Sequence, residues 1–481
     1  MRFLLLAFFV VTSLLSAQIE GVWKNYNNMN DIIQIDVSDD VLWAATSGGV
    51  FSYDYTTSEY TTYTKSEGLS SQNVTAIRIH PDGDVWVGTL EGYIDVINPN
   101  ENSISYITDI AKADQSSKRI NDFLVKGDSI YIATDFGISL MNANTLLFIE
   151  TYTKLGALTT NSKVFNLSFD TTIRALCEKG VAELIPGSIN PASPDAWESI
   201  TITGSASLFE YSSSVSYGGK SYIGTDNGVY RNVGTGILQD FLSGVSIYDL
   251  IVIDNVFYVV TSDNIYSYDG SNTQVLYSSS EYEYKGIYPG SPPLLLTSNG
   301  VTDFPPTGSD DFISPGGPAL NSFSDMVVDN DGNLWAGSGR ASSVGGIYKF
   351  DGIAWQNFNH NNTDVIKFDG FHRLYKGNNG VIYFANWGAG YSTYDDGEFL
   401  SFYPPELPVA GISVNPNFLV IWNLEEDSDG NLWLLNYEAS DRNVLSVKTD
   451  TGDWIQYRMA SPLSAVVGNA EHFAIDQNDT K

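Results

Sequence analysis

The chain has 481 residues, and its 57 acidic and 24 basic side chains give a formal net charge of −33 at pH 7. Such an excess of negative charge argues against a partner recognised through a phosphate backbone, so no nucleic acid is expected as a ligand. Cys177 is the single cysteine, which excludes an intrachain disulfide, and aromatic residues make up 13% of the chain, a composition that suits β-sheet surfaces.

The first 17 residues have the pattern of a secretory signal peptide. Arg2 gives a short basic start, an apolar stretch covers 3–15, and the small residues Ser16 and Ala17 precede a cleavage site. That stretch is too short to span a bilayer comfortably, and no later segment of this fragment has 18 consecutive apolar residues. The sequence therefore predicts an exported chain without a transmembrane span, located in the periplasm or at the outer cell surface.

One unit recurs at long period along the rest of the chain. Its clearest copies are DGDVWVGT at 82–89, DGNLWAGS at 331–338 and DGNLW at 429–433. Each copy is an Asp-Gly turn followed by a short apolar strand with a central aromatic residue. A second strand then follows, as in GVFSY at 49–53. Because Asp-Gly accepts the positive φ of tight hairpin turns, each unit is expected to contain a β-hairpin.

The centre of the first strand of this hairpin can be placed ten times, with a period of roughly 43 residues. The ten positions are Trp43, Trp86, Tyr131, Arg174, Tyr222, Tyr258, Leu294, Trp335, Tyr383 and Trp433. Such a period, with four strands in each unit, is typical of a β-propeller. The expected fold is therefore all-β and built of four-stranded antiparallel blades.

A change in composition separates the seventh unit from the eighth. Four prolines and three glycines fall within 305–318, which indicates a linker or an elaborated loop. We therefore expect tandem propellers: a seven-bladed β-propeller over 18–312, after the signal peptide at 1–17, and a partial second propeller over 313–481. A single ring of ten or eleven units, or a second ring inserted into the first, stays open as an alternative.

Both ends of the chain carry pieces of the repeat. The sequence WKNY at 23–26 resembles the outermost strand of other units, such as WQNF at 355–358. We expect it to complete a blade, because pairing the chain ends removes a free sheet edge. The segment 472–479 opens an eleventh unit whose aromatic position falls beyond Lys481. The sequence is therefore interpreted as a fragment of a longer protein.

No arrangement typical of catalysis accompanies the repeat. The four histidines are far apart in sequence, and His80, in a turn, is expected to be exposed. The Asp-rich turns at 329–333 and 427–431 depart from the spacing of a calcium-binding EF-hand loop, which favours structural hairpin turns. We expect no enzyme, no cofactor and no metal site. Abundant carboxylates nevertheless leave a polysaccharide lyase or glycosidase as an alternative.

A loop rich in aromatic residues, NWGAGY at 386–391, suggests where a ligand would bind. Trp387 and Tyr391 are the candidate residues for stacking on a sugar ring. The same sequence also fits a β-turn with packed aromatic side chains. Other binding residues are not indicated.

Two groups of residues resemble known propellers. VWVGT at 85–89, with the link KSEGLS at 65–70, resembles the two-component-regulator propeller repeat of Bacteroidetes-type bacteria. KRINDF at 118–123, followed by IYIATDFGIS at 130–139, resembles the N-terminal propeller of PorZ-type proteins, which are surface components of the type IX secretion system.

The PorZ resemblance implies two seven-bladed rings, a C-terminal β-sandwich and a non-enzymatic accessory role in secretion and in surface attachment of cargo. The implied partners are other secretion-system or cell-surface proteins, and lipopolysaccharide or glycan. The other repeat implies instead the periplasmic ligand-sensing propeller of a hybrid two-component regulator. A shared fold does not decide between these functions.

Overall fold

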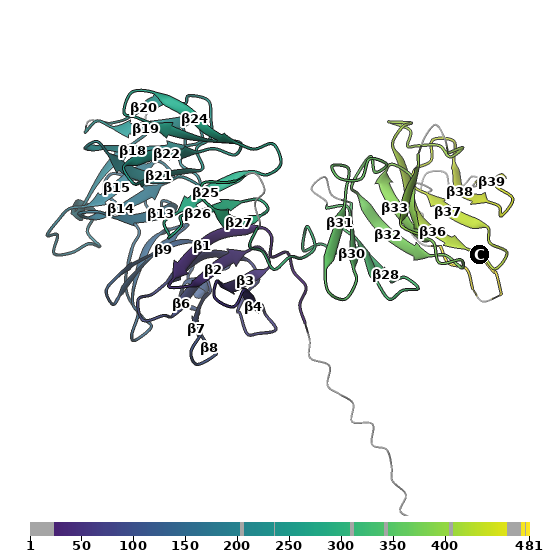
Figure 1. The fold of residues 1–481 in the computed structure, drawn as a ribbon, viewed down its shortest axis with the longest axis horizontal. Helices are drawn as coiled ribbons and strands as arrows, with labels where there is room; N and C mark the ends of the chain where they lie inside the picture. Colours follow the sequence, from purple (N-terminus) through teal and green to yellow (C-terminus); the bar gives the residue numbers. More distant parts are fainter. Residues whose placement is uncertain are drawn as a thin grey trace, which may run out of the picture.

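The computed structural model is almost entirely β-structure, as the sequence predicts. It describes residues 24–202, 206–234, 236–307, 312–340, 345–403, 407–458, 473–476 and 478–481. In these ranges there are 39 strands and two short helices, α1 (Asp109–Lys112) and η1 (Pro194–Ala196). Consecutive strands pair antiparallel into sheets that form the blades of two propellers in tandem (Figure 1). The predicted fold class is confirmed.

The first propeller contains blades 1 to 7, and each blade takes its strands in chain order. Blades 1 to 4 contain β1 (Ile32–Ser38), β2 (Val41–Thr46), β3 (Gly49–Asp54) and β4 (Glu59–Tyr63); β5 (Val74–Ile79), β6 (Val85–Thr89), β7 (Ile94–Asn98) and β8 (Ser103–Ile107); β9 (Ile120–Lys126), β10 (Ser129–Thr134), β11 (Gly137–Asn142) and β12 (Leu147–Tyr152); β13 (Val164–Phe169), β14 (Ile173–Cys177), β15 (Gly180–Leu184) and β16 (Trp197–Thr201). Blades 5 to 7 contain β17 (Ser214–Tyr217), β18 (Lys220–Thr225), β19 (Gly228–Asn232) and β20 (Ile237–Phe241); β21 (Asp249–Ile253), β22 (Val256–Val260), β23 (Asn264–Tyr268) and β24 (Thr273–Ser278); β25 (Tyr284–Tyr288), β26 (Leu294–Thr297) and β27 (Gly300–Asp303).

The second propeller is represented by blades 8 to 10. They contain β28 (Asp325–Val328), β29 (Leu334–Gly337), β30 (Ile347–Phe350) and β31 (Trp355–Phe358); β32 (Phe371–Lys376), β33 (Ile382–Gly388), β34 (Tyr391–Asp395) and β35 (Glu398–Phe402); β36 (Leu419–Glu426), β37 (Leu432–Asn436), β38 (Asn443–Lys448) and β39 (Trp454–Arg458). A short pairing between β33 and β36 joins blades 9 and 10 edge to edge.

The recurring central residue lies in the second strand of its blade in all ten cases, so the repeat frame read from the sequence is confirmed. These side chains enter the apolar layer between their own blade and the next one. Trp43 packs between blades 1 and 2, Trp86 between blades 2 and 3, and Trp335 between blades 8 and 9. Arg174 in blade 4 is the exception, because it forms an ion pair with Glu183 of its own blade.

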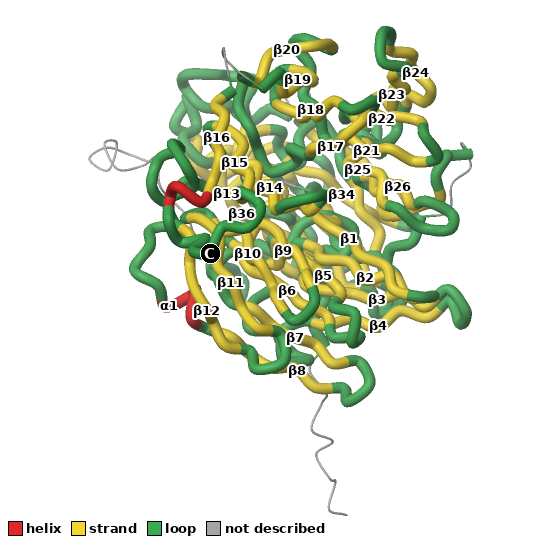
Figure 2. Tube along the Cα trace, turned by 90° about the vertical axis from the view of Figure 1, so that its left-hand side faces the viewer, coloured by secondary structure: helices red, strands yellow, loops and turns green. Residues whose placement is uncertain are grey.

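The first propeller closes on itself as a ring of seven blades. Ile32, Ile35 and Phe51 of blade 1 share one buried cluster with Leu294 and Leu296 of blade 7. Figure 2 shows the sheets of the first propeller following one another around a common centre. A single ring of ten or eleven blades is therefore excluded.

The seventh blade is completed differently from the expectation. Ile313 forms an antiparallel bridge with Val301 of β27, so the outer edge is covered by chain just after the blade itself. This residue lies one position past the predicted end of the first propeller. Trp23 lies outside the described residues, and Lys24 to Asn28 form no strand. The prediction that 23–26 closes a blade is wrong, because the place beside β27 is already taken.

The Asp-rich turns have a structural role that explains their recurrence. In blade 10 the Asp427 carboxylate accepts hydrogen bonds from the Trp433 indole N–H at 2.8 Å and from the backbone N–H of Asn431 at 2.9 Å. Burial raises the pKa of Asp427, but these hydrogen bonds outweigh it and lower the pKa to about 2. Asp329 holds Trp335 of blade 8 in the same way, at 2.8 Å.

His80 takes the corresponding place in blade 2, and the expectation that it is exposed is wrong. It is only 6% exposed, with Nδ1 2.8 Å from an Asp82 oxygen and Nε2 3.2 Å from the carbonyl of Gly127. The His80 ring therefore holds the turn of blade 2 against blade 3. Asp427, in contrast, stabilises the turn of its own blade.

Neither a membrane-spanning helix nor a metal-binding cluster is found in the described ranges. None of their helices has the length and apolar character that a membrane crossing requires. Over the same ranges, no three His, Cys, Asp or Glu side chains are grouped so as to hold an ion. Cys177 is buried between blades 3 and 4, and this burial raises the pKa of its thiol to about 12.

Candidate functional site

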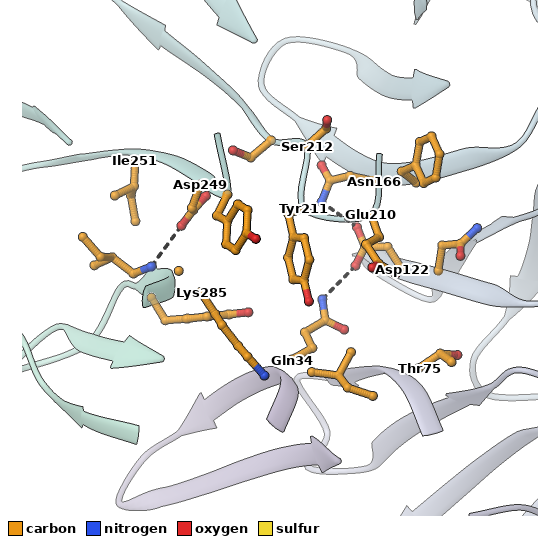
Figure 3. A pocket seen from close by; sticks show the side chains of 18 of the residues that line it. Gln34, Thr75, Asp122, Asn166, Glu210, Tyr211, Ser212, Asp249, Ile251 and Lys285 are labelled. Atoms are coloured by element: carbon orange, nitrogen blue, oxygen red, sulfur yellow. Dashed lines mark hydrogen bonds between the residues drawn. The ribbon is translucent and has the colours of Figure 1, made fainter. Parts of the chain in front are cut away.

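A pocket of about 240 Å³ lies at the centre of the first ring, and every one of the seven blades contributes to its lining (Figure 3). Its lining includes Ile33 and Gln34 from blade 1, Thr75 and Arg78 from blade 2, Asn121 and Asp122 from blade 3, Phe165 and Asn166 from blade 4, Glu210 to Ser213 from blade 5, Asp249 and Ile251 from blade 6, and Lys285 to Tyr288 from blade 7. We call it the axial pocket.

β-bulges aim side chains into the axial pocket. The pairing of the innermost strand with its neighbour skips one residue in five of the seven blades. A bulge kinks the strand and turns the extra side chain away from the regular ladder. The skipped residues are Ile33, Thr75, Asn121, Phe165 and Lys285, and all five line the pocket.

Asp122 connects four blades at the bottom of this lining. Its carboxylate accepts hydrogen bonds from the backbone N–H of Leu167 at 3.0 Å and from the side chains of Asn166 and Gln34, each at 3.2 Å. The Arg78 guanidinium lies 3.2 Å away and forms an ion pair with it. Asp122 is 1% exposed, so its charge is held almost entirely by these four groups.

Asp249 makes the corresponding contact between blades 6 and 7. One carboxylate oxygen accepts the backbone N–H of Ile287 at 3.0 Å. Burial raises the pKa of Asp249 to about 6, and hydrogen bonds from Ile287 and Ser213 only partly offset this effect. Burial also raises the pKa of the neighbouring Tyr288, and the charge of Asp249 adds to that rise.

The remaining polar groups of the pocket are also paired with one another. Arg119 of blade 3 lies 3.3 Å from Glu210, and Lys285 of blade 7 lies 3.0 Å from Asp31 of blade 1. Tyr211 and Tyr248 stack with ring centroids 4.8 Å apart. The described lining contains no histidine or cysteine, and its carboxylates bind backbone amides or cations. These contacts join different blades across the pocket.

An aromatic cluster occupies the equivalent place in the second propeller. The residues skipped by the bulges of β32 and β36 are His372 and Trp422. Their rings are 5.7 Å apart, and Trp387 lies 5.7 Å from His372 and 5.3 Å from Trp422. Tyr437 stacks on Trp422 at 5.1 Å, and the Arg340 guanidinium lies 4.7 Å from the Trp422 ring. We call these five residues the aromatic cluster.

The aromatic cluster is open to solvent on part of its surface. Trp387, Trp422 and Tyr437 are half-buried, whereas Arg340 is exposed. Burial lowers the pKa of His372 to about 4, and the charge of Arg340 acts in the same direction, so the imidazole is neutral at pH 7. The cluster therefore combines flat apolar faces with one cation and one neutral hydrogen-bonding ring.

The structure separates the two residues that the sequence predicts for sugar stacking. Trp387 belongs to the aromatic cluster, but Tyr391 is 1% exposed and stacks on Phe402 at 4.7 Å in the core between blades 9 and 10. Tyr391 is therefore a core residue and has no face free for a ligand. Sequence reasoning missed Trp422, although an alignment of the innermost strands would have placed it at the same bulge as Asn121.

Residues 42–185, which run from β2 of blade 1 to the end of β15 in blade 4, match the family model described as "TSS9, PorZ, N-terminal beta-propeller domain". The structure of PorZ from Porphyromonas gingivalis, a surface component of the type-IX secretion system, is 18% identical with a TM-score of 0.71. That similarity covers 91% of this chain and 60% of the PorZ chain, so this chain spans less than two thirds of the PorZ structure.

The extracellular domain of the putative hybrid two component system BT4673 from B. thetaiotaomicron is also similar. It is 16% identical over 92% of this chain and 62% of that chain, with a TM-score of 0.45. No curated protein matches the chain. The resemblance to the PorZ N-terminal β-propeller is confirmed over residues 42–185.

Proposed function

We propose that the chain is a non-enzymatic, exported propeller scaffold that acts as an accessory of type IX secretion and of the attachment of secreted proteins to the cell surface. The match of residues 42–185 to the PorZ N-terminal propeller carries this proposal. The predicted signal peptide at 1–17 agrees with export. The proposed division into a propeller over 18–312 and a second one from 313 agrees with a scaffold that presents two rings to its partners.

The chemistry of the axial pocket supports a scaffold more than an enzyme. Its most buried carboxylate, Asp122, binds four groups from three other blades, and Asp249 binds a backbone amide of the next blade. A catalytic acid or base must be within reach of a substrate and free to exchange a proton. These two carboxylates are instead committed to holding the ring together.

Other secretion-system or cell-surface proteins are the proposed partners. Deleting the gene tests the proposal, because surface display of secreted proteins should then fall.

We propose in addition that the aromatic cluster binds glycan, including the polysaccharide of lipopolysaccharide. Sugar rings stack on the apolar faces of Trp and Tyr, and Trp387 and Trp422 present such faces beside a guanidinium. Trp387, which the sequence suggests for stacking on a sugar ring, belongs to this cluster.

A titration with polysaccharide purified from the same cells tests this site. Binding should change the intrinsic Trp fluorescence, and Trp387→Ala should weaken it about tenfold, equivalent to about 1.4 kcal/mol. Trp454→Ala in β39, which lies outside the aromatic cluster, is the matched control and should bind like the wild type. Equal affinity of the Trp387→Ala and wild-type chains would exclude the site while leaving the scaffold proposal intact.

A further inference from the structure

The segment 25–28 has no partner strand, yet it contacts both propellers. It follows the predicted signal peptide and precedes β1, and its sequence is NYNN. Figure 1 shows this part of the chain, in purple, at the junction between the two groups of blades. We propose that residues 25–28 are a clasp that fixes the orientation of the second propeller relative to the first.

The clasp binds the first propeller through two side-chain amides. Asn27 donates from Nδ2 to the carbonyl of Gly48, in the turn between β2 and β3, at 3.0 Å. Asn25 donates to the hydroxyl of Thr64, just after β4, at 2.8 Å. Both partners belong to blade 1, so the segment is anchored on the outer part of that blade.

The same segment binds blade 8 of the second propeller on its other side. The Tyr26 ring lies 4.7 Å from that of Phe350 and 5.9 Å from that of Trp355, and these two aromatic side chains also stack on each other. Asn28 donates two hydrogen bonds to the segment that leads into this blade, from its backbone N–H to the side chain of Asn321 at 2.6 Å and from Nδ2 to the carbonyl of Ala319 at 2.7 Å.

The linker between the propellers is held by the same group of contacts. Asn321 donates from its own amide to the carbonyl of Ser47 at 2.9 Å, which ties the start of blade 8 directly to blade 1. Ala319 donates its backbone N–H to Asn357 at 2.9 Å. A Cβ atom at Gly317 would collide with the carbonyl oxygen of Asn27, so the glycine lets the linker pass against the clasp.

These contacts favour a rigid tandem over two independently moving rings. A linker rich in Pro and Gly normally allows neighbouring domains to move, and relative motion is the default for small polar interfaces. Here the amides of Asn27, Asn28 and Asn321 are committed to hydrogen bonds that cross the junction or fix the segment within it. The clasp would fix the orientation of the two propellers whichever partner the scaffold binds.

The distance between the two propellers, measured between spin labels, tests the clasp. Glu101→Cys, in the turn between β7 and β8, and Glu398→Cys, at the start of β35, place labels at exposed positions of blades 2 and 9. Cys177 does not interfere because it is buried. The full chain should give one narrow distance distribution. Combining Tyr26→Ala with Asn28→Ala should broaden that distribution at least twofold, because the aromatic contact and the hydrogen bond from Asn28 Nδ2 to the carbonyl of Ala319 are lost.

Tyr106→Ala, which removes an exposed tyrosine of β8 in blade 2, is the control and should leave the distribution narrow. Asn321→Ala removes the contact from the other side and should broaden the distribution even if the double variant folds poorly. A broad distribution in the unaltered chain would overturn the proposal. So would an unchanged narrow distribution in folded clasp variants.

Discussion

Replacing Trp86 with alanine is expected to lower the free energy of unfolding by about 3–5 kcal/mol. The indole is 1% exposed and lies between blades 2 and 3, with its ring 6.3 Å from that of Phe123 in an edge-to-face arrangement. Truncation would leave a cavity in a layer that also contains Ile120 and Ile132, whose strands cannot collapse without breaking blade pairing.

Denaturant-induced unfolding monitored by circular dichroism measures this loss. Tyr106→Ala, in the outermost strand of the same blade, removes a ring that is 58% exposed and should change stability by less than about 1 kcal/mol. If Trp86→Ala were no more destabilising than Tyr106→Ala, the recurring aromatic residue would not be an inter-blade core residue.

Replacing Asp122 with alanine is expected to have a comparable effect, about 3–5 kcal/mol, for an electrostatic reason. The substitution would leave the buried N–H of Leu167 without its acceptor and the Arg78 guanidinium without its nearest carboxylate. Because Asp122 links blades 1 to 4, the damage would spread across more than one interface.

Asp122→Asn separates the two parts of this effect. The amide retains an oxygen that can accept the N–H of Leu167 but loses the charge opposite Arg78. The free energy of unfolding of Asp122→Asn should therefore lie between that of the wild type and that of Asp122→Ala. Equilibrium unfolding of the three chains at neutral pH gives the ranking. A loss below about 1 kcal/mol for Asp122→Ala would show that water replaces the carboxylate without cost.

The positions of the repeats could be predicted from the sequence because a β-hairpin is determined by residues that lie close together in the chain. An Asp-Gly turn and an apolar strand identify the second strand in the clearest copies. The Gly-Val that opens the next strand, at 180–181 and 300–301, keeps the frame at Arg174 and Leu294, where the aromatic residue is absent. The polar contacts between blades were not predicted. Asp122 lies in the motif KRINDF at 118–123, but its partners are 44 to 88 residues away in sequence and belong to other blades.

The wrong predictions depended on tertiary context. Residues 23–26 have the pattern of an outer strand, but the edge of the seventh blade pairs with Ile313, and Tyr26 packs against the second propeller instead. His80 lies in a turn that a neighbouring blade covers. Trp387 and Tyr391 are separated by a tight turn, which breaks the alternation of strand faces and sends Tyr391 into the core.

Surface display of secreted proteins in a strain that lacks this gene tests the proposed scaffold role most directly. Intact cells would be labelled with an impermeant reagent, and the labelled proteins would be quantified in the parent, the deletion strain and a strain complemented with the full-length gene. The account predicts that surface-attached secreted proteins fall in the deletion strain, collect in the periplasm or medium, and return on complementation. Unchanged display in the deletion strain, together with a lost transcriptional response to an oligosaccharide, would contradict it and assign the chain to ligand sensing.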